Sequence, residues 1–475
     1  MSCEKKERLS VKPDGLLALN DALSLNGEQV KELHKKYLNS ALATLLGLIN
    51  FDKQFVKAQG VSVWDSKGRE YLDFLGAFGA LNLGHNHPKI IGALEKVKEL
   101  PNLLQSSLGT LAGALANNLA KITPGNLSRS FFCNSGAEAV EGALKLARIA
   151  TGRKEFIYCQ GSFHGKTFGA LSITGRKKYQ QPFLPLLPGC VEVPYGDLQA
   201  LNLSLKNQQV AAFIVEPIQG EGGIILPPPG YLAEARKLCS KYKTLFIADE
   251  VQTGFGRTGY MFACEYEGII PDIICLAKSL GGGVIPIGAY LTTDEIWKKA
   301  YGSMEKYTLH TSTFGGNSLA SAAAIATIEV IYEENLIEQV WEKGKYLLDK
   351  LLKLKEKYPH LLKDVRGRGL LIGLEFNQSK DSLSNRLSFG LVEKLSDEFL
   401  GSMVAGELLN KHGIITAYTL NNPNVIRLEP PLIVTYSQLN TVINSLEEIL
   451  GTHKGFLSVA VSTAKTAIKS LVTKK

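Results

Sequence analysis

Features that would mark a secreted, metal-binding or nucleic-acid-binding protein are scarce in this chain of 475 residues. The seven cysteines are an odd number, lie far apart and include no Cys-x-x-Cys pair, so neither a disulfide framework nor a zinc site is predicted. The formal net charge of +8 is modest for this length, and the lysines are scattered rather than gathered in a basic stripe. We therefore expect no metal and no nucleic acid among the ligands.

Long hydrophobic runs are also absent. The longest apolar stretch, residues 319–330, is too short to span a bilayer and is interrupted by Glu329. Residues 1–10 are charged and lack the apolar core of a signal peptide. The tail, residues 452–475, carries apolar side chains between lysines, which is more typical of a solvated or frayed helix than of a membrane contact. These observations favour a cytoplasmic protein that does not bind membranes.

The composition is that of a globular protein with a sizeable core, because apolar residues make up 45% of the chain and charged residues 21%. Between residues 82 and 331, short strand-like runs alternate with helical segments, and from Leu336 onward the pattern is that of an α+β domain. We predict an α/β fold with a large domain of mostly parallel sheet wrapped by helices and a smaller α+β domain. The predicted parts are an N-terminal helix and hairpin segment of the small domain (1–80), the large domain (81–335), the C-terminal small domain (336–451) and the tail (452–475).

Short apolar runs bounded by turn residues predict the strands of the large domain. These runs lie at residues 130–133, 155–159, 211–215, 245–248, 273–276 and 285–291. Helical spacing predicts helices at residues 28–46, 138–149, 404–412 and 437–450. A hairpin is predicted at residues 55–74, and two further strands at residues 370–376 and 425–428.

The first segment with chemical meaning is residues 132–138, where an apolar strand ends in small polar residues that open a helix. Free amide groups at such a helix start bind phosphate, and Gly136 lets a backbone come close. A plain capped helix has the same pattern, so this segment alone does not distinguish the two.

Two carboxylates, Asp249 and Glu250, follow the buried strand at residues 245–248. In open α/β sheets, ligands bind at the carboxyl ends of the strands. A carboxylate there could hold a protonated pyridine nitrogen, cap a helix or bind a metal. Taken alone, this segment leaves all three interpretations of Asp249 open.

Lys278 follows an almost wholly apolar strand and precedes the glycine run at residues 281–283. Burying a lysine is costly unless it is paired or used, and desolvation lowers its proton affinity so that it can act as a nucleophile. A structural lysine whose amine reaches solvent is the alternative. The phosphate cradle, the strand-end acid and this lysine fall on one edge of the predicted sheet, and together they are the parts needed to hold pyridoxal phosphate.

From about Phe74 to Leu450 the chain resembles a class III (ornithine-type) aminotransferase, one of the fold-type I enzymes that use pyridoxal 5′-phosphate. Ordered motifs carry the resemblance: residues 134–138 (NSGAE), 163–166 (FHGK), 216–223 (EPIQGEGG), 249–254 (DEVQTG), 277–278 (AK) and 312–317 (STFGGN). Several ordered matches of this kind are specific for the family.

The resemblance implies roles around the cofactor. Lys278 holds the cofactor aldehyde, and Asp249 pairs with the pyridine nitrogen. Val251 and Phe163 lie on the two faces of the ring, while Gln252 approaches the ring hydroxyl. The phosphate is held around Ser135, Gly136 and Ala137, and the motif residues His164 and Glu216 complete the cofactor-binding set.

A further implied contact crosses between subunits. The threonine that matches Thr313 reaches the phosphate of the neighbouring subunit, so we expect a homodimer with shared active sites. Whether dimers pair into tetramers is left open.

Three residues concern the substrates. Arg427 matches the arginine that clamps a substrate carboxylate, for which its planar fork is well suited. Glu221 matches the glutamate that pairs with this arginine when the bound substrate lacks a carboxylate there, and a purely structural ion pair is the alternative. Lys166 stands where related enzymes commonly carry an arginine that contacts the distal carboxylate of 2-oxoglutarate. Its alternative role is that of a surface cation at the site mouth.

Within the class, Lys166 and residues 220–232 are most similar to putrescine (diamine) aminotransferase. Ala137 and the loop at residues 75–81 depart from that enzyme's pattern and leave the exact amine open. The resemblance implies polyamine catabolism, with the terminal amino group of putrescine moved to 2-oxoglutarate to give glutamate and 4-aminobutanal, which cyclises to 1-pyrroline. Ornithine, acetylornithine and 4-aminobutyrate aminotransferases are alternatives within the class. An aminomutase acting on glutamate semialdehyde and a scaffold without catalysis are alternatives outside it.

Overall fold

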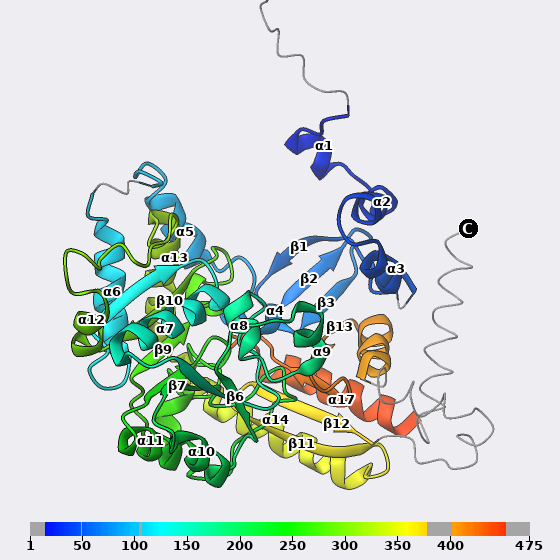
Figure 1. Ribbon diagram of the computed structural model, residues 1–475. Helices are drawn as coiled ribbons and strands as arrows, with labels where there is room; N and C mark the ends of the chain where they lie inside the picture. Colours follow the sequence, from blue (N-terminus) through cyan, green and yellow to red (C-terminus); the bar gives the residue numbers. More distant parts are fainter. Residues whose placement is uncertain (1–14, 49, 104–106, 378–400, 453–475) are drawn as a thin grey trace, which may run out of the picture.

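Three β-sheets, each accompanied by helices, make up the part of the molecule that the structure describes (Figure 1). The computed structural model describes residues 15–48, 50–103, 107–377 and 401–452. In those ranges no helix is long and apolar enough to cross a membrane. The predicted tail beyond residue 452 lies outside the described residues.

The largest sheet has seven strands in the order β4-β10-β9-β8-β7-β5-β6. Their bounds are β4 Arg129–Cys133, β5 Glu155–Cys159, β6 Cys190–Val193, β7 Val210–Val215, β8 Leu245–Asp249, β9 Ile273–Leu276 and β10 Gly288–Thr292. All neighbours run parallel except β10, which is antiparallel to both β4 and β9. The prediction of a mostly parallel sheet is therefore confirmed. The sequence does not predict β6, because this edge strand is only partly buried and has no continuous apolar run.

Each face of this sheet has its own core, because alternate side chains of a strand point to opposite sides. In β7, Phe213 and Val215 join one cluster while Ala212 and Ile214 join the other. One cluster is completed by α7 (Gly136–Thr151), α8 (Phe168–Ser172) and α12 (Asp294–Tyr301). The other includes α5 (Pro88–Lys96), α6 (Thr110–Ile122), α10 (Leu198–Leu205), α11 (Tyr231–Lys241) and α13 (Ser318–Glu333). Burial on both faces explains the continuous apolar runs of the central strands.

The N-terminal sheet has the order β1-β2-β3-β13. It joins β1 (Phe55–Gln59), β2 (Ser62–Asp65) and β3 (Glu70–Asp73) to β13 (Ile414–Ile415), which pairs parallel with β3. The predicted hairpin at residues 55–74 is thus three strands rather than two. The helix predicted at residues 28–46 is broken into α2 (Gly27–Tyr37) and α3 (Ser40–Leu48). The break follows from Asn39, whose Oδ1 accepts a hydrogen bond from the Leu42 amide and caps the second helix.

The C-terminal sheet has the order β11-β12-β15-β14, with β11 Leu362–Arg368, β12 Leu371–Phe376, β14 Ala417–Tyr418 and β15 Val425–Leu428. Helices α14 (Leu336–Lys357) and α17 (Tyr436–Thr452) pack beside it. The strand predicted at residues 425–428 is confirmed. The helix predicted at residues 404–412 is confirmed: residues 401–407 are helical, and the helix ends in the π-helical turn η4 (Leu408–His412). The sequence does not predict β11, since charged residues interrupt its apolar side chains.

Short helical turns connect these parts. They are α1 (Leu19–Leu23), α4 (Gly76–Gly79), α9 (Lys177–Gln180), η1 (Gln181–Phe183), η2 (Ala263–Glu267) and η3 (Lys278–Gly281). Two of them matter for the site, because η3 contributes Lys278 to the cavity wall and α4 is followed directly by Ala80, which also lines the cavity.

Candidate active site

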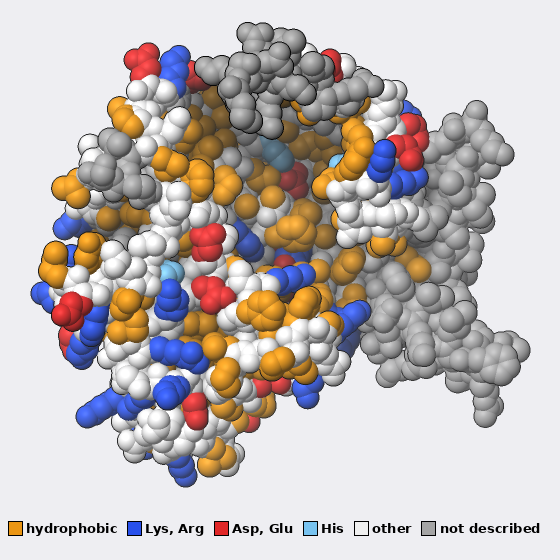
Figure 2. Space-filling model, turned by 45° about the horizontal axis from the view of Figure 1, so that its top comes forward, with side chains coloured by type: hydrophobic (Ala, Val, Ile, Leu, Met, Phe, Trp, Pro, Cys, Tyr) orange, Lys and Arg blue, Asp and Glu red, His pale blue; other side chains and the backbone are white. Residues whose placement is uncertain are grey.

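A cavity of about 440 Å³ opens beside the carboxyl ends of the central strands. Figure 2 shows one face of the molecule hollowed near its centre, with hydrophobic side chains around much of the hollow. Most of the residues predicted for the cofactor line the cavity: Ser135, Gly136, Ala137, Phe163, His164, Glu216, Asp249, Val251, Gln252 and Lys278. The structure thus brings together the helix start, the strand-end acid and the strand-end lysine that the sequence places on one edge.

The start of α7 forms one wall of the cavity. The hydroxyl of Ser135 accepts a hydrogen bond from the Glu138 amide at 3.2 Å and caps the helix. A Cβ atom on Gly136 would lie 2.8 Å from Cγ1 of Val251, so only glycine lets these two segments approach. The first amides of a helix have no partner within it and carry partial positive charge, so this wall suits an anionic group such as phosphate.

Asp249, at the end of β8, is held from two sides. Its Oδ2 lies 2.6 Å from Nδ1 of His164, and its Oδ1 accepts a hydrogen bond from the Val251 amide at 3.1 Å. Burial disfavours the charged imidazole, but the hydrogen bond and the charge of Asp249 outweigh it and raise the pKa of His164. Nε2 of His164 is buried without a hydrogen-bond partner. Among the described residues, no cluster of His, Cys, Asp or Glu could hold a metal, so the metal-ligand interpretation of Asp249 gains no support.

The second strand-end carboxylate, Glu250, has a different role. It is fully buried and accepts hydrogen bonds from the amides of Ala263 at 3.0 Å and Cys264 at 2.7 Å, and from the Thr253 hydroxyl. Glu250 therefore fixes the following loop, and Asp249 alone of the pair faces the cavity.

Glu216 lines the cavity and fixes the backbone of two neighbouring segments. Its carboxylate accepts hydrogen bonds from the amides of Phe163 at 2.8 Å and Gly220 at 3.3 Å. Burial raises the pKa of Glu216 to about 7; nearby His164 opposes the rise and Asp249 adds to it.

Lys278 lies two residues after the end of the short strand β9, from which Ala277 separates it. Its φ of 49° lies in the left-handed region, which costs a non-glycine residue about 1–2 kcal/mol and persists mainly at functional positions. No hydrogen bond or ion pair to its amine is found within the described ranges. Burial lowers the pKa of Lys278, and the charges of Glu429 and Glu221 oppose this shift. A lysine of this kind supplies the neutral amine that attacks a carbonyl.

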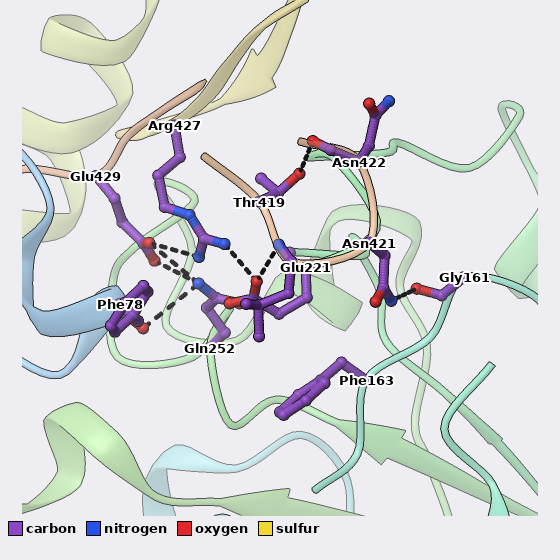
Figure 3. A network of polar contacts seen from close by, with 12 residues as sticks. Phe78, Gly161, Phe163, Glu221, Gln252, Thr419, Asn421, Asn422, Arg427 and Glu429 are labelled. Atoms are coloured by element: carbon purple, nitrogen blue, oxygen red, sulfur yellow. Dashed lines mark hydrogen bonds and ion pairs between the residues drawn. The ribbon is translucent and has the colours of Figure 1, made fainter. Parts of the chain in front are cut away.

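A buried charged cluster lies next to the cavity (Figure 3). Arg427 on β15 donates through Nη2 to Oε2 of Glu221 at 2.5 Å, and its Nη1 lies 3.6 Å from Oε2 of Glu429. Glu221 also accepts a hydrogen bond from the Leu420 amide at 2.9 Å. Burial works against ionisation of Glu221, but the charge of Arg427 outweighs it and lowers the pKa of this carboxyl. Nε2 of Gln252 donates to both carboxylate oxygens of Glu429 at 3.0 Å.

Four predicted residues do not line the cavity of this chain: Lys166, Glu221, Thr313 and Arg427. Glu221 and Arg427 form the adjoining cluster. Lys166 is exposed, with its amine 4.7 Å from the centre of the Tyr179 ring. Thr313 is exposed on the segment between α12 and α13.

The sequence prediction gave no role to Glu429, although it did single out the loop at residues 75–81, whose Gly76 and Gly79 lie against Glu429. Phe78 of that loop lies 5.2 Å from the Arg427 guanidinium. The signal for Glu429 was its place two residues after Arg427, where an acidic residue interrupts an apolar run before two prolines.

Comparison with known proteins gives a consistent result. Residues 49–450 match the family model for class-III aminotransferases. The ornithine aminotransferase from Toxoplasma gondii ME49 is 32% identical, covers 95% of this chain and 100% of its own, and superposes with a TM-score of 0.80. Another structure of the Toxoplasma gondii enzyme has PLP at partial occupancy in its active site.

Two bacterial structures are similar as well. The acetylornithine aminotransferase from Elizabethkingia anophelis is 32% identical over 90% of this chain and 100% of its own, with a TM-score of 0.73. An (S)-enantioselective omega-transaminase from Thermomicrobium roseum is 30% identical over 84% of this chain and 92% of its own, with a TM-score of 0.75.

Proposed function

Because the chain belongs to the class III aminotransferases, which use pyridoxal 5′-phosphate, we propose that it moves the terminal amino group of a diamine such as putrescine to 2-oxoglutarate. When bound, the cofactor supplies an aldehyde that takes up the amino group and a ring that withdraws electrons from the substrate carbon. The observation that carries the proposal is the meeting of the α7 start, Asp249 and Lys278 at one cavity. Its volume of about 440 Å³ lies in the range of small-molecule sites.

The residues at the cavity fit the cofactor by charge and shape. Amides of Gly136 and Ala137 and the hydroxyl of Ser135 would hold the phosphate. Asp249, fixed by His164 at 2.6 Å, would accept a hydrogen bond from the protonated ring nitrogen, which would keep the ring electron-poor. The apolar side chains of Val251 and Phe163 enclose the ring, and Gln252 approaches its hydroxyl.

Lys278 carries the chemistry. Its lowered pKa favours the neutral amine, the form that would bond to the aldehyde of the bound cofactor and give way to the donor's amino group. Nζ of Lys278 would then be free to take a proton from the donor carbon that bears nitrogen and to give it up again, acting first as base and then as acid. With the keto acid bound, the same amine moves the proton in the opposite direction.

The Arg427–Glu221 pair supports an exchange of two unlike substrates at one site. While Glu221 holds Nη2 of Arg427, the guanidinium is neutralised and a donor without a carboxylate is accepted. A keto-acid carboxylate displaces Glu221 and takes the guanidinium itself, because the planar fork binds carboxylates in bidentate fashion. Contact of Lys166 with the distal carboxylate of 2-oxoglutarate requires its amine to leave the Tyr179 ring.

A donor panel tests the proposal. The purified enzyme with cofactor and 2-oxoglutarate is assayed for glutamate with putrescine, cadaverine, ornithine, acetylornithine and 4-aminobutyrate. We expect the highest kcat/KM with putrescine. A higher value with ornithine favours the second candidate, ornithine aminotransferase, which the 32% identity to the Toxoplasma enzyme supports. Absence of glutamate with every donor contradicts both and favours an aminomutase.

The complete site requires two subunits in this proposal. Thr313 is exposed on its own chain and does not line the cavity there. We infer that it contacts the cofactor phosphate in the partner subunit of a homodimer.

A further inference from the structure

We propose that Glu429 binds the distal ammonium group of a cationic amine donor, and that this carboxylate makes the site selective for a donor with a second positive charge. This assignment rests on the proposed function, since it names the residue that recognises the far end of the diamine. Glu429 lies just after β15 and is completely buried.

Gln252 links this carboxylate to the cavity. The Gln252 side chain lines the cavity, and its Nε2 donates to both oxygens of Glu429 at 3.0 Å (Figure 3). Both oxygens therefore act as hydrogen-bond acceptors, as an ammonium donor requires. A substrate ammonium that displaces the Gln252 side-chain amide would therefore find the Glu429 carboxylate already oriented.

Two glycines of α4 let its backbone approach Glu429 closely. A Cβ on Gly79 would lie 2.5 Å from Oε1 of Glu429, and a Cβ on Gly76 would lie 2.5 Å from its backbone oxygen. Both glycines have positive φ, 83° and 53°, which other residues adopt only with strain. The α4 turn therefore places no side chain of its own between its backbone and this carboxylate at these two positions.

Arg427 is hydrogen-bonded to Glu221 but not to Glu429, whose Oε2 lies 3.6 Å from Nη1. The buried guanidinium of Arg257 also acts on Glu429 through its charge. At the oxygens of Glu429, the second ammonium of a diamine would supply a charge-assisted hydrogen bond that neither arginine makes with them. Nε and Nη1 of Arg427 have no hydrogen-bond partner, so they stay available for the carboxylate of the keto acid. The charges of Glu429 and Glu221 both oppose the lowered pKa of Lys278, and that of Glu429 is the larger effect.

The test compares three donors of equal length whose distal ends differ in charge: putrescine, n-pentylamine and 4-aminobutyrate. Their kcat/KM values are measured with 2-oxoglutarate for the wild type and for Glu429→Gln. We expect the putrescine-to-pentylamine ratio to fall about 10- to 100-fold in the variant, as for the loss of one charge-assisted hydrogen bond. The value for 4-aminobutyrate should not fall, because its carboxylate no longer meets a like charge.

Two further variants define the outcome. Glu295→Gln, which changes an exposed carboxylate on α12, should leave the ratio unchanged. Glu429→Asp keeps the charge on a side chain one methylene shorter, so its preference should move from putrescine toward cadaverine. If Glu429→Gln does not bind the cofactor, as judged by the absence of its absorption band, the test rests on Glu429→Asp. A Glu429→Asp variant that keeps the wild-type preference between putrescine and cadaverine would overturn the proposal.

The two proposals fail in different ways. A wild type that turns over no diamine contradicts the proposed function. A wild type that uses putrescine, combined with an equal loss for putrescine and pentylamine in Glu429→Gln, contradicts only the assignment of Glu429 and makes it a structural partner of Gln252 and Arg427.

Discussion

Single residues in the site owe their chemistry to burial and to one or two partners. Lys278 is desolvated and has no hydrogen-bond partner among the described residues, which favours its neutral form. Asp249 is oriented by His164 and by the backbone of Val251. Neighbouring Glu250 has a similar sequence context but satisfies backbone amides instead. Reactivity at this edge therefore depends on which carboxylate the strand turns toward the cavity.

The raised pKa of Glu216 predicts a pH-dependent stability. Because its pKa is about 7 in the folded chain and near 4.5 when unfolded, the folded state binds the extra proton between these values. Its contribution to stability is complete below about pH 4.5 and is lost as the pH rises through 7, by a few kcal/mol at most. We expect the melting temperature of cofactor-free wild type, relative to Glu216→Gln, to fall between pH 5 and pH 8. A difference that stays constant across this range would contradict the assignment.

The elements of the site show what a sequence can and cannot predict. Strands buried on both faces, such as β8 and β9, have continuous apolar runs, so their ends and the residues that follow were predictable. The edge strand β6 and the charged strand β11 lack such runs and were not predicted. The domain boundaries drawn from the sequence stay predictions.

The close contact between α7 and the loop after β8 predicts the effect of one methyl group. Gly136→Ala places a Cβ 2.8 Å from Val251, so the two segments must separate and the enclosure of the ring must loosen. We expect the Kd for pyridoxal 5′-phosphate, followed by absorption, to rise about 10-fold or more, as for a loss of about 1.4 kcal/mol.

Gly113→Ala is the matched control for this change. Gly113 also lies in a helix, α6, and an added Cβ there meets no atom within 4 Å. Alanine should stabilise α6 slightly and leave cofactor affinity unchanged. Equal cofactor affinity in both variants would show that the α7 contact does not shape the site.

At the scale of the whole molecule, segments from all three sheets converge beside one cavity. Gln252 and Glu429 are 177 residues apart, and Arg427 and Glu221 are 206 residues apart. Such contacts depend on how the C-terminal sheet packs against the large sheet, which local sequence patterns do not contain. For this reason the motifs predicted Arg427 and Glu221, while the position of Glu429 became evident only from the structure.

The proposed sharing of sites between subunits predicts complementation. Lys278→Ala and Thr313→Ala are each expected to be nearly inactive at limiting cofactor. If Thr313 acts in the partner's site, subunit exchange creates hybrid dimers with one intact site, and activity should recover to about a quarter of wild type for random pairing. If Thr313 serves its own chain, the mixture should show no recovery.

The covalent attachment of the cofactor to Lys278 is the central claim, and reductive labelling tests it most directly. Cofactor-saturated enzyme is treated with sodium borohydride, digested and analysed by mass spectrometry. We expect a single cofactor adduct on the peptide that contains Lys278, together with loss of the visible absorption band. An adduct on another lysine, or a wild-type band in Lys278→Ala, would contradict the account.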